Sequence, residues 1–226
     1  MIYFDNVTKI FPPNCVALAD ISFAVSEGEF VSIVGRSGAG KTTLLRLLLA
    51  EERPTKGSIY FEDVDITKLS PSYIPYYRRK IGVVYQDYKL LPQKTVFENV
   101  AFPLEILGKS SSEIKRTVPQ ALELVGILDK ANNFPAQLSG GEQQRAVIAR
   151  AIISQPKVLL ADEPTGNLDV FTAREIIKLF LKINQLGTAV ILATHDREIV
   201  NTIQKRVIVL EKGRIIRDEQ KGKYYL

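Results

Sequence analysis

A glycine-rich segment at residues 35–42 constrains the fold of this chain more than any other part of its sequence. It follows an apolar run at residues 30–34, precedes an apolar helical run, and consists of Gly35-Arg36-Ser37-Gly38-Ala39-Gly40-Lys41-Thr42. Glycines let such a loop curl until backbone N–H groups converge on an anion, and the N-terminus of the following helix adds partial positive charge. The segment therefore predicts a phosphate-binding loop between a buried strand and a helix.

Side chains in and after this loop are candidates for binding a triphosphate and its metal. Lys41 is placed to reach the β- and γ-phosphates, and the hydroxyl of Thr42 can complete the octahedral shell of Mg²⁺. A glycine-rich turn that only starts a helix is the alternative interpretation, but the strand and helix on either side argue against it. We expect phosphate contacts from Gly35, Ser37, Gly38, Ala39, Gly40, Lys41, Thr42 and Thr43.

Short apolar runs with β-branched residues recur along the chain and predict buried strands. They are residues 30–34, 81–85, 158–161, 189–193 and 207–210. Helical segments adjoin several of them, at residues 41–49, 171–183 and 197–203. This alternation predicts an α/β fold with a mostly parallel sheet and helices on both faces.

Two regions depart from this alternation. Residues 2–10 and 17–25 are β-like runs joined by Pro12-Pro13-Asn14, which predicts an N-terminal antiparallel β-subdomain. Between residues 87 and 155 helical patterns dominate, which predicts an inserted helical subdomain. We expect one domain over 1–226, with its core in 1–86 and 156–226.

The expected helical insertion has two clear helical patterns, at residues 112–125 and 143–153. Pro119 lies inside the first pattern. A proline in a helix interior removes one hydrogen bond and costs about 3 kcal/mol. We therefore expect a kink or a split at this residue.

Composition excludes several classes of protein. The chain is 46% hydrophobic and 24% charged, which is typical of soluble globular proteins, and no apolar run is long enough for a transmembrane helix or a signal peptide. The single cysteine, Cys15, cannot form an internal disulfide, which suits the reducing cytoplasm. The net charge of +5 permits nucleic acid, anionic lipid or phosphate ligands without choosing among them.

Two carboxylates follow the predicted strand at 158–161. Asp162 is placed to bind Mg²⁺ directly or through water, while Glu163 can act as general base toward the nucleophilic water. Alone, the pair is equally consistent with a solvated strand end. The presence of a phosphate-binding loop in the same chain favours the catalytic interpretation over a solvated strand end.

His195 and Gln86 also follow predicted strands, at the sheet edge where open α/β sheets bind ligands. A lone histidine is more often structural than catalytic. At this edge we expect His195 to hydrogen-bond the γ-phosphate, position the attacking water and link Glu163 to the site. The side-chain carbonyl of Gln86 can reach Mg²⁺ or water.

A further motif, Leu138-Ser139-Gly140-Gly141-Glu142-Gln143-Gln144-Arg145, places a helix-capping serine before two glycines. It occurs in order with the phosphate loop, Gln86, Asp162-Glu163, Asn167-Leu168-Asp169 and His195. Together these motifs resemble the nucleotide-binding domain of ABC transporters over the whole chain. The resemblance implies a P-loop NTPase core, ATP as substrate and ATP hydrolysis.

The resemblance also implies a head-to-tail dimer that holds two ATP molecules. Each ATP would lie between the phosphate loop of one copy and Ser139, Gly140, Gly141 and Gln143 of the other. Phe11 takes the place of the usual A-loop tyrosine and would stack on adenine, although a core aromatic is the alternative. Asp169 would couple the two sites.

Within that family the chain resembles bacterial cell-division ATPases, which act with an integral membrane partner to regulate peptidoglycan hydrolases. Residues 85–87, 90–92, 95–100, 133–135 and 160–169 carry this resemblance. Lipoprotein-release and macrolide-export cassettes share residues 160–169, so an exporter subunit is the alternative. Either implies a peripheral position on the cytoplasmic face of the membrane, and we expect the membrane contact near residues 88–95.

Two other classes of function use the same motifs. A chromosome-structure ATPase would carry a long coiled-coil insertion and an ABC translation factor two cassettes, and neither occurs in this sequence, so we expect no nucleic-acid partner. A scaffold that binds ATP without relying on turnover is the second alternative. The complete set of expected catalytic residues favours hydrolysis.

Overall fold

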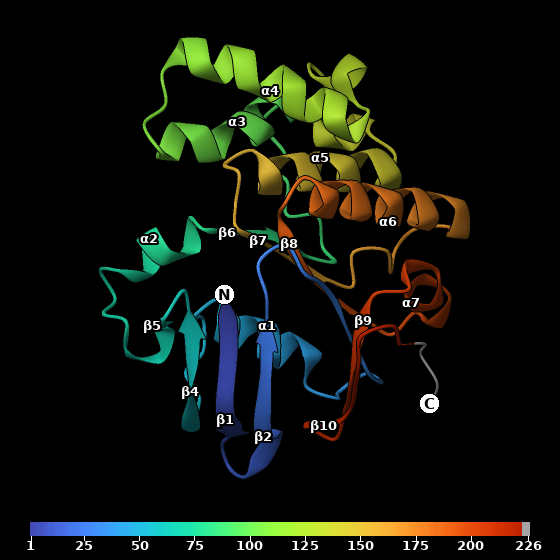
Figure 1. The fold of residues 1–226 in the computed structure, drawn as a ribbon. Helices are drawn as coiled ribbons and strands as arrows, with labels where there is room; N and C mark the ends of the chain where they lie inside the picture. Colours follow the sequence, from blue (N-terminus) through green and yellow to red (C-terminus); the bar gives the residue numbers. More distant parts are fainter. Residues whose placement is uncertain (223–226) are drawn as a thin grey trace.

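The computed structural model describes residues 1–222 and contains two β-sheets with helix α1, Lys41–Leu48, between them (Figure 1). The larger sheet has the strand order β10-β9-β3-β8-β7-β6. Its strands are β3 Phe30–Val34, β6 Ile81–Val84, β7 Val158–Asp162, β8 Ala189–Thr194, β9 Arg206–Glu211 and β10 Arg214–Glu219. All neighbours pair in parallel except β10 with β9. The predicted mostly parallel sheet is confirmed, and β10 was not predicted.

The smaller sheet is antiparallel and has the order β2-β1-β4-β5. Its strands are β1 Ile2–Phe11, β2 Cys15–Val25, β4 Lys56–Phe61 and β5 Val64–Asp65. The predicted pairing of β1 with β2 is confirmed. Strands β4 and β5 were not predicted, because short strands interrupted by polar residues give little periodic signal.

Side-chain alternation along the large sheet separates two cores. On β7, Leu159 and Ala161 pack toward one face, while Val158 and Leu160 pack with α1 and the small sheet. Every residue of β3 and β8 is buried, as expected for parallel strands covered on both faces. Fully burying one such aliphatic side chain contributes about 1.5–3 kcal/mol.

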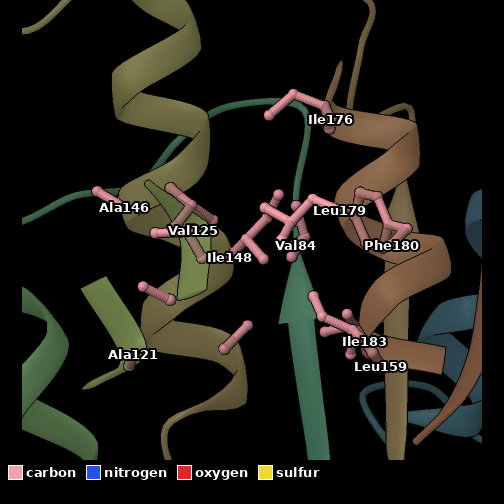
Figure 2. Close-up of a cluster of buried hydrophobic side chains, with 14 of the residues drawn as sticks. Val84, Ala121, Val125, Ala146, Ile148, Leu159, Ile176, Leu179, Phe180 and Ile183 are labelled. Atoms are coloured by element: carbon pink, nitrogen blue, oxygen red, sulfur yellow. The ribbon is translucent and has the colours of Figure 1, made fainter. Parts of the chain in front are cut away.

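Helices α5 and α6 cover the first of these faces, and α3 and α4 lie beyond them (Figure 1). Figure 2 shows Val84 of β6 between Ile148 of α5 and Leu179 of α6. The helices after α1 are α2 Ile74–Arg78, α3 Val96–Ile106, α4 Ser111–Val125, α5 Gly140–Ile152, α6 Val170–Gln185 and α7 Arg197–Ile203. Helices α2 and α3 were not among the predicted helices.

We predicted a kink or a split at Pro119. Helix α4 runs through Pro119 without a break, so a split is excluded, and a kink stays a prediction. Ser110 caps its first turn in a reciprocal hydrogen-bond pair with Glu113, and Val118, Ala121, Leu122 and Val125 bury its apolar face. Packing of this face compensates for the hydrogen bond that proline removes.

None of the helices within residues 1–222 combines the length and the apolar character that a membrane crossing requires. The expected core region ends at residue 226, and its last four residues lie outside the described part of the chain.

Candidate functional site

A pocket of about 410 Å³ opens where the carboxyl ends of β3, β7 and β8 meet the small sheet. Its walls come from the start of β2, from the glycine-rich loop with α1, and from the segments that follow β6, β7 and β8. They are Cys15, Val16, Ala17, Ser37, Gly38, Ala39, Gly40, Lys41, Thr42, Thr43, Gln86, Glu163 and His195. The fold thus brings together most of the residues that the sequence marked for phosphate and catalysis.

The glycine-rich loop closes tightly around the amine of Lys41. The side chain of Lys41 is buried, and its Nζ donates to the carbonyl oxygens of Gly35 at 2.8 Å and Arg36 at 3.5 Å. Gly40 has φ of 106°, and a Cβ there would lie 2.6 Å from the carbonyl oxygen of Ala17. Only glycine fits between the loop and β2, which fixes the start of α1 beside the pocket.

Asp162 is paired with Thr42 beside the first pocket, which Thr42 lines. The hydroxyl of Thr42 donates to Asp162 Oδ2 at 2.9 Å, whereas Asp162 Oδ1 is buried and finds no hydrogen-bond partner among residues 1–222. Burial raises the pKa of Asp162, and the nearby charge of Glu163 adds to this, although the bond from Thr42 opposes it. An unpaired buried carboxylate oxygen beside a hydroxyl is a suitable ligand pair for a hard cation.

Glu163 lies between Lys41 and His195 in the pocket. Its Oε1 is 3.3 Å from Lys41 Nζ and 2.9 Å from His195 Nδ1, and the backbone N–H of His195 donates to its Oε2 at 3.3 Å. The backbone of Glu163 is left-handed, with φ of 48°, and its N–H donates to the carbonyl of Ala193. This turn, strained for a non-glycine residue, directs the carboxylate back over the end of β8.

Gln86 enters the pocket directly after β6. Its Nε2 is 3.1 Å from the position that a Cβ of Gly166 would occupy, and its backbone carbonyl oxygen accepts from Asn167 Nδ2 at 3.4 Å. The residues after β6 and β7 therefore touch each other through Gln86.

A second hollow, of about 720 Å³, gathers the other expected nucleotide residues. Ser139, Gly140, Gly141 and Asp169 line it, together with Asn167, Phe171 and Thr172. None of these residues lines the first pocket within the described chain, so the two sets of expected nucleotide residues lie in separate hollows of one copy.

The local geometry of this hollow comes from helix caps. Ser139 Oγ accepts from the N–H of Glu142, and Asp169 accepts from the N–H groups of Phe171 and Thr172. Gly141 is required for close packing, since a Cβ there would lie 2.6 Å from Thr172 Cγ2. The first turns of α5 and α6 therefore meet at the hollow.

The family model described as "ABC transporter" matches residues 18–166, which spans the glycine-rich loop, the Ser139 motif and Asp162-Glu163. The chain belongs to the ABC transporter family. It is an ATP-binding and ATP-hydrolysing cassette of that family.

Sequence similarity to curated relatives indicates which kind of ABC cassette this chain resembles. The cell division ATP-binding protein FtsE of Bacillus subtilis is 53% identical over 224 residues, which is 99% of this chain and 98% of the relative. FtsE of Escherichia coli is 47% identical over 215 residues, or 95% and 97% of the two chains. These relatives confirm the predicted similarity to cell-division ATPases.

Solved cassettes share the fold. The dimeric, post-hydrolysis structure of the cassette MJ0796 bound to ADP and Pi has a TM-score of 0.89 and 36% identity, with 99% of this chain and 100% of that one covered. CbiO1 of Clostridium perfringens, part of the ABC transporter complex cbiONQ, has a TM-score of 0.91 and 31% identity, with 97% and 88% covered. The predicted fold class is confirmed.

Four expected residues of this ABC cassette are not among the residues within 1–222 that line the two pockets: Phe11, Gly35, Asp162 and Gln143. Asp162 is hydrogen-bonded to Thr42, which does line the first pocket. Phe11, at the end of β1, has Lys9 Nζ 4.7 Å above its ring. Gly35 packs under the loop, where a Cβ would lie 2.4 Å from the carbonyl oxygen of Leu210. Gln143 donates to the carbonyl of Leu138. Their contacts with nucleotide or Mg²⁺ remain predictions.

Sequence reasoning missed Cys15, Val16 and Ala17, which line the pocket from the start of β2. No motif marks them. They reach the cassette's pocket because the small sheet packs beside the glycine-rich loop, and only tertiary structure creates this proximity.

Proposed function

We propose that this cassette hydrolyses ATP with Glu163 as general base and His195 as the group that orients the attacking water and contacts the γ-phosphate. The contact of Glu163 with His195 supports this assignment, because a base held by a second polar group keeps a fixed direction. Lys41 and the loop amides of Ser37 to Thr43 bind the phosphates. A triphosphate there competes with Glu163 for the ammonium of Lys41.

Mg²⁺ fits the oxygen donors in and beside the pocket. Thr42, Asp162 and Gln86 would hold it, and the unpaired Oδ1 of Asp162 is the observation that favours a cation there. Mg²⁺ bound there would neutralise negative charge on the phosphate oxygens.

Two copies of the cassette would act together, head to tail. The observation that carries this proposal is the separation of the half-sites, with Lys41 in one pocket and Ser139 in another hollow of the same chain. Each ATP would then lie between the loop of one copy and the Ser139, Gly140, Gly141 and Gln143 segment of the other. Asp169 would couple the two sites, and Phe11 would stack on adenine.

The membrane partner would be an FtsX-type integral membrane protein, with the cassette held at the cytoplasmic face. The FtsE relatives, at 47–53% identity, support this over a lipoprotein-release or macrolide exporter. Opening and closing of the dimer would move the helical segment 87–155. This segment would contact the membrane partner near residues 88–95, and its motion would thereby regulate peptidoglycan hydrolases. Gln86 supports this route, since it joins the pocket to that segment.

Two measurements test the proposal. Calorimetry with Mg-ATP should show binding to the full chain and its loss in Lys41→Ala, because Lys41 provides the buried cation of the phosphate loop. Copurification of the tagged chain from membranes, followed by mass spectrometry, should recover an FtsX-type polypeptide. Equal heats for the two proteins would refute the phosphate site, and a permease of the exporter type would refute the cell-division assignment.

A further inference from the structure

The loop that carries Gln86 bends sharply at residues 85–89. Lys89 has a left-handed backbone, with φ of 48°, and its Nζ lies 3.8 Å from the centroid of the Tyr85 ring. The loop therefore folds back on itself around Gln86. A non-glycine residue in this conformation costs about 1–2 kcal/mol, so the bend needs support from outside the loop.

That support comes from Arg150, in the last turn of α5. Its Nη1 donates to the carbonyl oxygen of Lys89 at 2.8 Å, and its Nη2 donates to that of Tyr88 at 3.1 Å. Two parallel bonds from one planar guanidinium fix both the position and the direction of two consecutive peptide groups.

The hydrogen bonds that the Arg150 side chain donates within residues 1–222 go to these two carbonyl oxygens. No carboxylate within residues 1–222 forms a salt bridge with it, and burial lowers the pKa of its guanidinium. A charge partly withdrawn from water is costly unless its hydrogen bonds are good, so the two bonds to the loop are its compensation.

The first turn of α5 contacts the same loop. The hydroxyl of Tyr88 would be 2.9 Å from a Cβ at Gly140, so only a glycine lets the Tyr88 ring lie this close. Both ends of helix α5 thus contact the loop, the first turn through Gly140 and the last turn through Arg150. Ser139, which caps α5, belongs to the half-site expected to face the ATP of the second copy.

We propose that Arg150 is a positioning residue for ATP hydrolysis, which ties the loop bearing Gln86 to helix α5. Gln86 in one half-site and Ser139 in the other then move as one rigid unit. Arg150 does not line the pocket that holds Lys41 and Gln86, so it would act through Gln86. This inference rests on the proposed function, because it presupposes the role of Gln86.

Arg78 provides a matched control. Its Nε and Nη2 donate to the carbonyl oxygens of Leu49 at 2.9 Å and Ala50 at 3.3 Å, again two consecutive peptide groups. Those groups follow α1 and do not belong to the Gln86 loop. Arg78→Met therefore removes the same kind of interaction from another place.

The experiment compares Arg150→Met, Arg150→Lys and Arg78→Met in the full chain, purified with its copurifying membrane partner. Arg150→Met should lower kcat by about 10- to 100-fold, as misplacement of a catalytic group by about 1 Å does, and leave KM for ATP within about two-fold. Arg150→Lys should recover part of kcat, since an ammonium can serve one carbonyl. Arg78→Met should leave kcat within about two-fold.

A double-mutant cycle separates positioning from general stability. On a Gln86→Ala background, Arg150→Met should reduce kcat by less than about two-fold, because the group it positions is already gone. Additive losses in kcat would overturn the proposal. So would equal kcat for Arg150→Met and Arg78→Met.

Hydrogen exchange gives a readout that does not depend on turnover. Arg150→Met should speed amide exchange in the 85–95 peptide of the full chain, whereas Arg78→Met should not. Unchanged exchange there would contradict the proposal even if the wild-type chain hydrolysed no ATP. If Lys41→Ala and wild type showed the same ATP binding and turnover, the proposed function would fail instead, so the two failures are distinguishable.

Discussion

The ammonium of Lys41 lies 3.3 Å from the carboxylate of Glu163, at the base of the nucleotide pocket. The cation proposed to bind phosphate and the proposed general base thus pair with each other, and both are largely shielded from water, with side-chain exposures of 8% and 16%. Binding of a triphosphate to Lys41 would release the Glu163 carboxylate for its contact with water and His195. Under the proposed roles, this ion pair would couple substrate binding to preparation of the base.

Glu163→Gln should retain ATP binding and lose turnover. The amide is isosteric but cannot accept the proton of the attacking water, so hydrolysis should fall by about 100-fold or more. Light scattering with Mg-ATP should then show a stable dimer, whereas Lys41→Ala should remain monomeric. Rapid turnover in Glu163→Gln would refute the base assignment.

Asp162→Asn should stabilise the fold in buffer without nucleotide or Mg²⁺. Burial raises the pKa of Asp162 in the folded state, so the stability that this group contributes is present at low pH and is lost as the pH rises through the folded pKa. At pH 7 its charge is therefore unfavourable, and the neutral amide removes that cost. Urea unfolding should give a higher midpoint for the variant at pH 7. A lower midpoint would contradict the prediction.

Gln144→Leu should also stabilise the chain, by about 1 kcal/mol. Gln144 is fully buried in α5, and neither polar atom of its side chain has a hydrogen-bond partner in the part of the protein that the structure describes. A leucine of similar volume removes two unsatisfied groups and adds apolar contact. Denaturant curves should compare it with Gln185→Leu at the exposed end of α6, for which a change within about 0.5 kcal/mol is expected. Destabilisation by Gln144→Leu would show that the amide is paired in solution.

Glu62→Gln should weaken the fold more at pH 7 than at pH 3. Glu62, in the turn after β4, accepts from Lys157 and Lys80, and these bonds, that from Lys157 foremost, lower its pKa. A lowered folded pKa means that the stability is present above the unfolded pKa and is lost as the pH falls through the folded one. Unfolding midpoints of wild type and variant should therefore converge in acid. A constant difference between pH 7 and pH 3 would exclude this ion-pair origin.

Prediction succeeded where local sequence carries a strong physical signal. Apolar runs ending in polar residues located β3, β7 and β8 and the candidate residues at their carboxyl ends, and Ser139 marked the start of α5 through its capping side chain. It failed for β4 and β10, whose partly exposed residues lack a clear alternation of apolar and polar side chains. At Pro119, buried neighbours keep α4 continuous where local propensity indicated a possible break.

The sequence by itself determined the strand-loop-helix unit around Lys41, because glycine conformational freedom and helix capping act between near neighbours in the chain. Tertiary structure alone decided that Cys15 to Ala17 wall the pocket, that Glu163 pairs with both Lys41 and His195, and that Ser139 faces a separate hollow. These relationships join residues that are far apart in the chain: Cys15 and His195 line one pocket, and Lys41 pairs with Glu163. Such contacts depend on how two sheets and a helical layer pack, and packing is a property of the whole core.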